Sequence, residues 1–91
     1  MIKKNFRTGV VTFTFDSPSK EKVYLVGDFN NWDANATPMS KKSTKWSIDV
    51  KLKPGKYQFK YLASGAWHND HKADAYTASP FGGDNSIVII P

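Results

Sequence analysis

The feature that most constrains how this chain can fold is a two-residue alternation of apolar and polar side chains. Residues 45–52, KWSIDVKL, carry an apolar side chain at every second position. Residues 57–62, YQFKYL, repeat the pattern with Tyr57, Phe59 and Tyr61 on one face. Because successive side chains of a β-strand point to opposite faces, both segments predict strands with one buried face. Nowhere do apolar residues recur at helical spacing over ten or more positions, so the chain is predicted to be all-β.

Further strand signals surround these two segments and are separated by turn-forming residues. Alternation over residues 10–15 predicts another strand, while the apolar runs at 23–26 and 87–90 predict a central strand and a final strand. Residues 68–84 read as a long polar segment. Six or seven short strands predict an antiparallel sandwich or a small barrel. Two-faced strands of about eight residues favour two packed sheets with the aromatic faces inside.

Length and charge restrict the classes of function. A chain of 91 residues is expected to form one domain, spanning residues 1–91. The sequence has no cysteine, no signal-peptide-like stretch and no membrane-spanning apolar run, which together predict a cytoplasmic protein without membrane contact. The net charge of +5 raises nucleic acid as a partner. The lysines, however, are spread singly or in small clusters beside turns, as on a solvated surface.

Catalytic and metal-binding patterns are weak. The HNDH motif places His68, Asp70 and His71 close together, with Asp74 nearby. No helical pattern puts the two histidines on a common face, so we interpret them as surface residues and predict no metal site. Asp70 and Asp74 could form a carboxylate pair, but glycoside chemistry needs two carboxyls fixed across a deep cleft. A small β-domain seldom encloses such a cleft, so we predict a protein that is not an enzyme and has no cofactor.

Two tryptophans lie outside the alternating strands. Trp32 follows a polar turn in FNNWD, and Trp67 follows another in SGAWHND. Each could fold back over an edge of the core, or each could form an exposed platform. A platform would suit a sugar, because pyranose C–H groups pack on an indole face and hydroxyls bond to amides. Lys60 lies on the outer face of its predicted strand and could donate to a hydroxyl.

The order of several motifs resembles carbohydrate-binding module family 48. The motifs are VYLVGDFNNWD, then LKPGKYQFKYL, GAW, ADAY and FGGDNSIVII, and they cover nearly the whole chain from Val11 to Ile90. This family includes the glycogen-binding domain of the AMP-activated protein kinase β subunit. It also includes the N-terminal early-set domains of isoamylases and glycogen branching enzymes. The resemblance is strongest to short bacterial proteins that consist of this one domain.

The resemblance implies an immunoglobulin-like, early-set antiparallel β-sandwich of about seven strands. It also implies binding of an α-1,4-linked glucan, as a polysaccharide such as glycogen or starch or as a maltooligosaccharide. Gly83 stands where the kinase domain has a threonine, so one side-chain contact is absent. Phe81 stands where that domain has a leucine, and an aromatic ring there could stack instead. The carbohydrate-binding residues implied by the resemblance are Trp32, Lys60, Trp67, Phe81 and Asn85.

Two other functions are alternatives to glucan binding. The first is a protein-interaction or scaffolding domain that docks on a glycogen-metabolising enzyme, which an apolar patch away from the tryptophans would favour. The second is single-stranded nucleic-acid binding, which lysines and aromatic rings can support. No motif of an RNA-recognition domain is present, and the aromatic residues of YQFKY alternate toward the core. We therefore predict no nucleic-acid partner.

Overall fold

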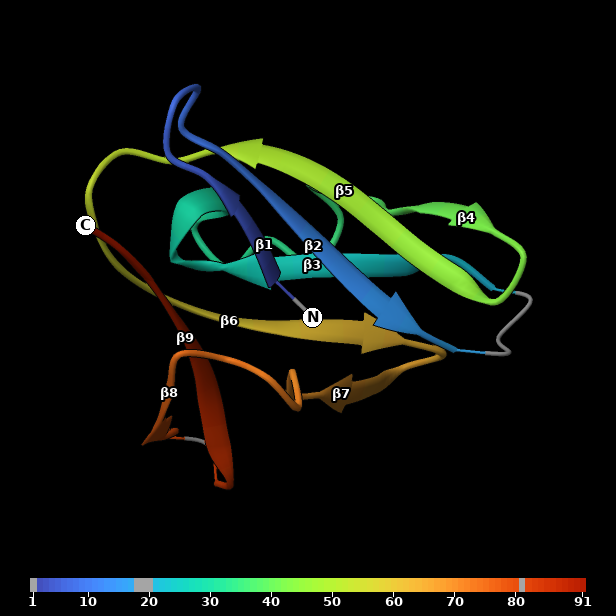
Figure 1. Cartoon of the computed structure of the whole chain (residues 1–91). Coiled ribbons are helices and arrows are strands. Elements are labelled where there is room, and N and C mark those ends of the chain that lie inside the picture. The colour runs from blue at the N-terminus through green and yellow to red at the C-terminus, as the bar shows by residue number, and fades with distance from the viewer. Residues whose placement is uncertain (1, 18–20, 81) are drawn as a thin grey trace.

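Two antiparallel sheets make up the computed structural model, which describes residues 2–17, 21–80 and 82–91 (Figure 1). The first sheet has the strand order β1-β2-β5-β4. Its strands are β1 (Ile2–Asn5), β2 (Val10–Asp16), β5 (Lys45–Lys51) and β4 (Ser40–Lys42). The second sheet has the order β3-β6-β9-β8, and β7 also pairs with β6. Its strands are β3 (Val23–Gly27), β6 (Gly55–Ala63), β9 (Asp84–Ile90), β8 (Ala75–Ala78) and β7 (Ala66–His68).

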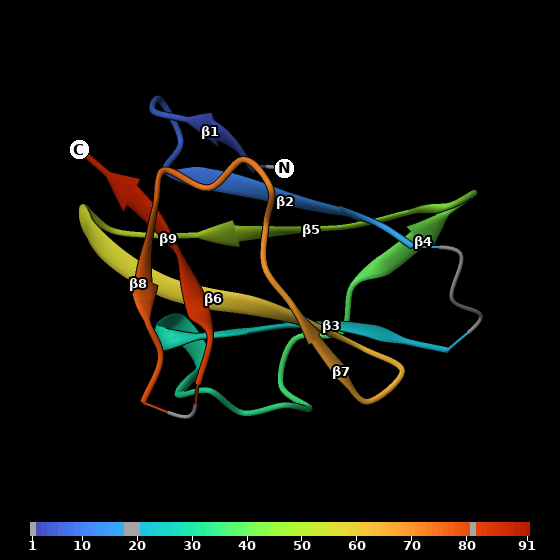
Figure 2. The ribbon, with the colours of Figure 1, turned by 90° about the horizontal axis from the view of Figure 1, so that it is seen from below.

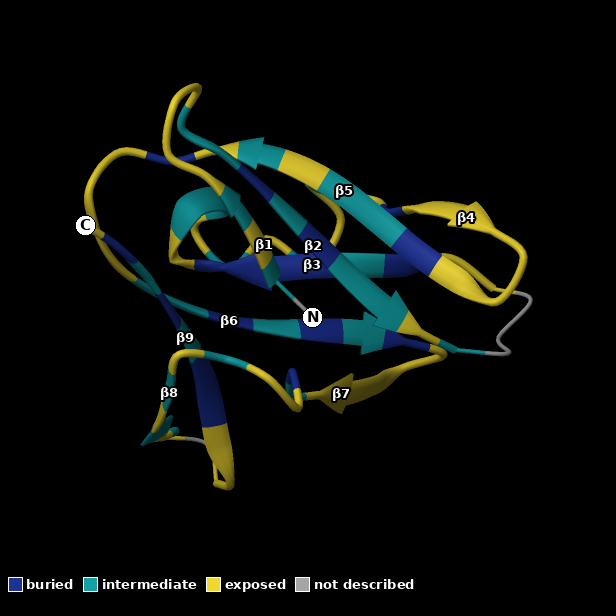
Figure 3. Cartoon of the chain, in the orientation of Figure 1, coloured by how far each residue is buried: buried dark blue, intermediate teal, exposed yellow. Residues whose placement is uncertain are grey.

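The two sheets pack face to face, which confirms the predicted all-β sandwich. In Figure 2, β2 and β5 lie above β3 and β6. Buried apolar residues from both layers form one core cluster. Antiparallel pairing of β2 with β5 sets Phe13 opposite Ile48 and Phe15 opposite Trp46. From the other layer, Phe59 packs edge-on against Phe13 at a ring separation of 5.1 Å. The alternating strands therefore supply the core from both sides, as the dark segments of Figure 3 show.

The position of β3 differs from the prediction. The apolar run at 23–26 indicated a central strand, but β3 is an edge strand that pairs with β6 alone in its sheet. Residues 37–39 cover its other edge, where Leu25 N–H donates to the Thr37 carbonyl and Met39 N–H donates to the Val23 carbonyl. The run is apolar because Leu25 and Val26, on opposite faces, are both fully buried. Coverage by a loop has replaced the expected second strand.

Four short strands, β1, β4, β7 and β8, were not predicted. The polar segment at 68–84 contains β8, and Trp67 lies on β7 rather than on a turn. Each of these strands has three or four residues, which is too short for alternation to be visible. Three of them extend a sheet edge, and β7 and β9 pair with consecutive parts of β6.

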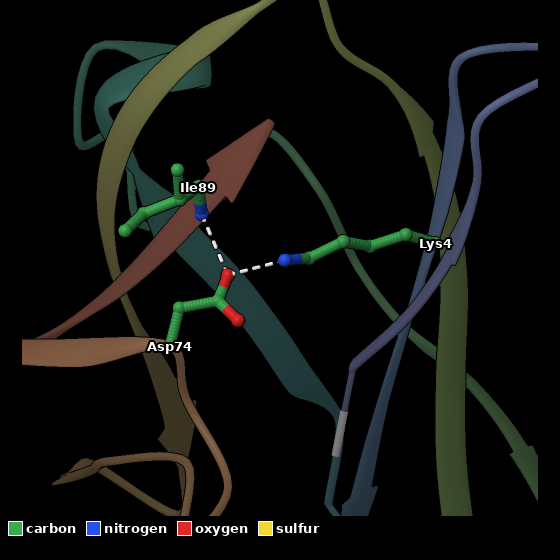
Figure 4. A network of polar contacts seen from close by, with 3 residues as sticks. All are labelled: Lys4, Asp74 and Ile89. Atoms are coloured by element: carbon green, nitrogen blue, oxygen red, sulfur yellow. Dashed lines mark hydrogen bonds and ion pairs between the residues drawn. The ribbon is translucent and has the colours of Figure 1, made fainter. Parts of the chain in front are cut away.

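An ion pair connects the two sheets at the end of β1. Lys4 Nζ lies 2.6 Å from Asp74 Oδ2, and the same oxygen accepts the Ile89 N–H of β9 at 2.7 Å (Figure 4). Asp74 directly precedes β8, so one carboxylate contacts elements from both layers. This contact ties the first strand of one sheet to the last strand of the other.

Candidate functional site

A pocket of about 530 Å³ lies on the outer face of the five-stranded sheet. Its lining residues are Trp32, Gln58, Lys60, Trp67, Ser79, Pro80, Gly82 and Asn85. Four of the five carbohydrate-binding residues expected from the resemblance therefore surround one cavity. The fifth, Phe81, lies outside the described residues. The turn residue Trp32 and the strand residue Trp67 are 35 positions apart in the chain, and the fold brings both to the same pocket.

Trp32 is placed by a tight turn at the end of β3. The turn begins at Gly27, continues as the short 3-10 helix η1 (Asp28–Asn30), and closes when Trp32 N–H donates to the Gly27 carbonyl at 2.9 Å. Asn31 and Trp32 both have φ near 57°, in the left-handed region that bulky side chains rarely adopt. The indole N–H donates to Asp28 Oδ1 at 2.8 Å. Both backbone and side chain thus hold the indole half-buried at the pocket.

The asparagine at the centre of this turn holds the loop to the sheet. Asn30 Oδ1 accepts the Gly27 N–H at 3.0 Å, and Asn30 Nδ2 donates to the Leu25 carbonyl and to Thr37 Oγ1. Phe29 packs against the core with its ring 5.7 Å from that of Phe13. Asn30 and Phe29 anchor the turn to the sheet and the core, and Trp32 lines the pocket.

The opposite part of the pocket is built on β6 and β7. Phe59 and Tyr61 face the core, so the alternate residues Gln58 and Lys60 face outward. Trp67 is directly opposite Leu62 in the pairing of β7 with β6, and 49% of its surface is exposed. Because β7 pairs with β6, Lys60 and Trp67 lie on the same sheet, and both line the pocket.

Asn85 is the one buried residue among the described residues that line the pocket. Only 6% of its surface is exposed, and its Nδ2 donates to Gln58 Oε1 at 3.0 Å. Gln58 was not among the predicted site residues, although its outward position beside Lys60 in the alternating strand was a usable signal. Ser79, Pro80 and Gly82 were also missed, because they come from a connection between β8 and β9 that has no sequence periodicity.

The HNDH motif has a structural role at Asp70. His68 and His71 are exposed, as predicted, whereas Asp70 is only 2% exposed. Its carboxylate accepts the Tyr61 hydroxyl and the Lys72 N–H, each at 2.7 Å. Burial alone would raise the pKa of Asp70, but hydrogen bonds to its carboxylate, these two among them, lower the pKa and leave it below its ordinary value. Burial and the same Asp70 contact raise the pKa of Tyr61 far above its ordinary value.

The described residues also bear on metal binding and on membrane insertion. No group of three or more histidine, cysteine, aspartate or glutamate side chains lies close enough to hold a metal ion there. In the same residues, no helix is long and apolar enough to cross a bilayer.

Three relatives illustrate the known proteins to which this chain is similar in sequence. The chain is 34% identical over 85 residues to the chloroplastic phosphoglucan phosphatase LSF1 of Arabidopsis thaliana. It is 31% identical over 72 residues to the chloroplastic Protein PTST homolog 2 of the same plant, and 35% identical over 80 residues to a 1,4-alpha-glucan branching enzyme of Clostridium perfringens. These alignments cover 91%, 79% and 82% of this chain, but the chain spans only 14%, 13% and 12% of the three relatives.

Residues 10–90 match the family described as the glycogen recognition site of AMP-activated protein kinase. The match covers nearly the whole chain, and it confirms the resemblance that the FNNW, KYQFKY and DNSIVII segments carry. The observed sandwich agrees with that family's immunoglobulin-like, early-set fold. On this coverage, the chain belongs to the carbohydrate-binding family of the glycogen recognition site of AMP-activated protein kinase.

Proposed function

We propose that this chain binds α-1,4-linked glucan without catalysing a reaction on it. The observation that carries the proposal is that Trp32, Lys60, Trp67 and Asn85 line the same pocket. Two indoles and two polar side chains from different parts of the sequence surround a cavity of about 530 Å³, within the size range of ligand pockets. The ligand we propose is a segment of glycogen or starch, or a maltooligosaccharide.

The chemistry of the lining suits sugar rings. The faces of Trp32 and Trp67 offer apolar, electron-rich surfaces for pyranose C–H groups. The Lys60 ammonium donates to hydroxyl oxygens, and Gln58 and Asn85 add amide groups that can donate or accept. Glucan is uncharged, so a site that combines aromatic faces with a few hydrogen-bonding groups matches it better than a cluster of charges would.

The lining also supports a non-catalytic role. No carboxylate is among the pocket residues that the structure describes, whereas glycoside hydrolysis requires a pair of them. The relatives named for a reaction, the phosphoglucan phosphatase and the branching enzyme, are each several times longer than this chain. We propose that the part they share with this chain contacts glucan and that their reactions occur elsewhere in those proteins.

Migration in a native gel containing glycogen tests this function. We expect glycogen to retard the wild-type chain, and we expect Trp32→Ala and Trp67→Ala each to abolish most of the retardation. A matched control is Phe6→Ala, because Phe6 is 70% exposed and lies outside the pocket. It should migrate like the wild type. Equal migration of the wild-type chain with and without glycogen would refute glucan binding.

A second candidate function, docking on a glycogen-metabolising enzyme, is favoured by one observation. A separate cavity of about 420 Å³ lies beside Phe6 and is lined largely by apolar residues, including Leu52, Pro54 and Ile90. An exposed phenylalanine beside an apolar hollow is a common feature of protein contacts. A pull-down with a purified branching enzyme would separate the two functions. If this chain docks on the enzyme through that cavity, Phe6→Ala should no longer capture the branching enzyme, whereas Trp67→Ala should still capture it. Equal capture by both variants would count against docking.

A further inference from the structure

We infer that Asp28 is a positioning residue for the glucan site: its carboxylate fixes the indole of Trp32 in the orientation that stacks on a sugar. The inference rests on the proposed function and adds a residue that the resemblance did not indicate. Asp28 does not line the pocket, so it would act through Trp32 rather than through a contact with the ligand.

The two oxygens of the Asp28 carboxylate bond to two different elements. Oδ1 accepts the Trp32 indole N–H at 2.8 Å, and Oδ2 accepts the backbone N–H of Gln58 at 2.7 Å. The register of β3 against β6 pairs Gly27 with Phe59, so the next position along would pair residue 28 with Gln58. The strand has already turned into η1 there, and the Asp28 side chain supplies an acceptor beyond the end of β3.

The backbone at Trp32 explains why such an anchor matters. A tryptophan at φ near 57° is in an unfavourable conformation, and it persists only if surrounding contacts outweigh the strain. The bond from Trp32 N–H to the Gly27 carbonyl fixes the backbone but leaves the ring free to rotate about its side-chain bonds. The charged acceptor on Asp28 restrains that rotation, because hydrogen bonds to ionised groups are stronger than neutral ones.

The same carboxylate links the two parts of the pocket. Gln58 lies two residues before Lys60 on β6, and its side chain accepts the amide of Asn85. Asp28 therefore ties the Trp32 turn to the strand that carries Lys60. A ligand that contacts both meets a preformed surface, so less conformational freedom is lost on binding.

A double-mutant cycle on affinity for a maltooligosaccharide, such as maltoheptaose, tests the role of Asp28. We expect Asp28→Ala to weaken binding about tenfold in the wild-type background, as expected for losing a hydrogen bond to a charged group. Trp32→Phe keeps an aromatic face but has no N–H. In that background Asp28→Ala should change the affinity less than about threefold, because only the bond to the Gln58 N–H is left to lose. Equal losses in the two backgrounds would overturn the inference.

Asp28→Asn separates positioning from folding. Its carbonyl oxygen can still accept the indole N–H, while its amide group opposes the Gln58 N–H, so we expect lower stability but an affinity within about threefold of wild type. Loss of affinity equal to that of Asp28→Ala would overturn the inference. Asp49→Ala is the matched control, because it removes an exposed carboxylate from the other sheet and should leave the affinity unchanged.

A ligand-free measurement distinguishes failure of the inference from failure of the proposed function. The indole N–H resonance of Trp32 in an NMR spectrum should exchange slowly with solvent in the wild-type chain and in Asp28→Asn. It should exchange faster in Asp28→Ala, with the resonance of Trp67 unchanged. Unchanged exchange for Trp32 in Asp28→Ala would refute the anchor, whether or not the chain binds glucan.

Discussion

Gly27 shows how closely the site turn approaches the sheet. A Cβ atom on this residue would lie 2.5 Å from the Gln58 carbonyl oxygen and 2.8 Å from the Phe59 Cβ, distances that packed atoms do not reach. Its φ of −175° is ordinary extended backbone, so the requirement for glycine here is one of space. We predict that Gly27→Ala lowers the free energy of unfolding by roughly 1–3 kcal/mol, the usual cost of overpacking, as measured by urea denaturation.

Gly65 provides the comparison for this substitution. A Cβ there would meet no atom within 4 Å, but its φ of +75° strains any other residue. Gly65→Ala should therefore cost only about 1–2 kcal/mol of backbone strain and leave glucan affinity intact. Gly27→Ala should weaken glucan binding as well, because the Trp32 turn must move. Full affinity in Gly27→Ala would contradict the close packing.

The buried carboxylate of Asp70 predicts a pH dependence of stability. The pKa of Asp70 is lower in the folded chain than in the unfolded chain. The ionised carboxylate therefore makes its full contribution to the free energy of unfolding above the unfolded pKa, near 4. That contribution disappears as the pH falls through the lower, folded value. Asp70→Asn should cost roughly 1–3 kcal/mol at pH 7, since the amide cannot accept both the Tyr61 hydroxyl and the Lys72 N–H.

Urea denaturation at pH 7 and near pH 3 measures this effect. The difference in unfolding free energy between the wild type and Asp70→Asn should shrink at the lower pH. Asp49→Asn serves as the control, because Asp49 is exposed and accepts one hydroxyl bond from Thr12. Its cost should stay within about 0.5 kcal/mol. A difference in unfolding free energy between the wild type and Asp70→Asn that grows as the pH falls would contradict this prediction.

The edge strand β1 is attached to the other sheet by a side-chain ion pair. It pairs only with β2 in its sheet, and the Lys4 ammonium connects it to Asp74 beside β8. We predict that Lys4→Met accelerates amide hydrogen exchange in β1 and lowers the free energy of unfolding by about 0.2–1 kcal/mol, the range for a surface ion pair.

The control for this prediction is Lys3→Met, on the same strand. Lys3 is exposed and points to the opposite face, so its substitution should leave exchange in β1 unchanged. Partial burial disfavours a charge on Asp74, but the Lys4 ammonium and the Ile89 N–H outweigh it and lower the pKa of Asp74. The effect of Lys4→Met should accordingly fade below about pH 4. Identical exchange in both variants would show that the ion pair does not hold β1.

Alternation made the long strands predictable. In β2, β5 and β6 enough residues face the core to reveal the two-residue period, and the structure follows it. Sequence periodicity could not reveal β4, β7 or β8, because their three or four residues are mostly exposed and their pairing depends on neighbours distant in the sequence. The placement of β3 was wrong because a loop that covers an edge buries a strand as effectively as another strand does.

The candidate site was predictable in part for a similar reason. Trp32 and Trp67 were found because turn chemistry could not explain a tryptophan in either place. Asp28 was missed because an aspartate after a glycine is ordinary in a turn, so its residue type raised no question. Its two contacts, with the Trp32 indole and with the Gln58 N–H, depend on β3 and β6 lying side by side. Only the folded chain brings those groups together.

For the molecule as a whole, salt dependence distinguishes an uncharged ligand from a charged one. The net charge of +5 would make nucleic-acid binding fall steeply with salt, as counterions compete for the lysines. We predict that affinity for maltoheptaose changes less than about twofold between roughly 50 and 500 mM NaCl, because a neutral glucan displaces no counterions. Isothermal titration calorimetry measures this directly, with a single-stranded oligonucleotide as the comparison ligand. A steep salt dependence for the sugar would argue against the proposed site.

The two layers of the sandwich also differ in charge. Strands of the four-stranded sheet carry six lysines and two aspartates, namely Lys3, Lys4, Lys41, Lys42, Lys45, Lys51, Asp16 and Asp49. Those of the five-stranded sheet carry Lys56, Lys60 and Asp84. Among the strands, positive charge is therefore concentrated on the sheet that lies away from the pocket. Near a negatively charged surface, this distribution would favour contact through the four-stranded sheet and leave the tryptophan-lined face open to the solution.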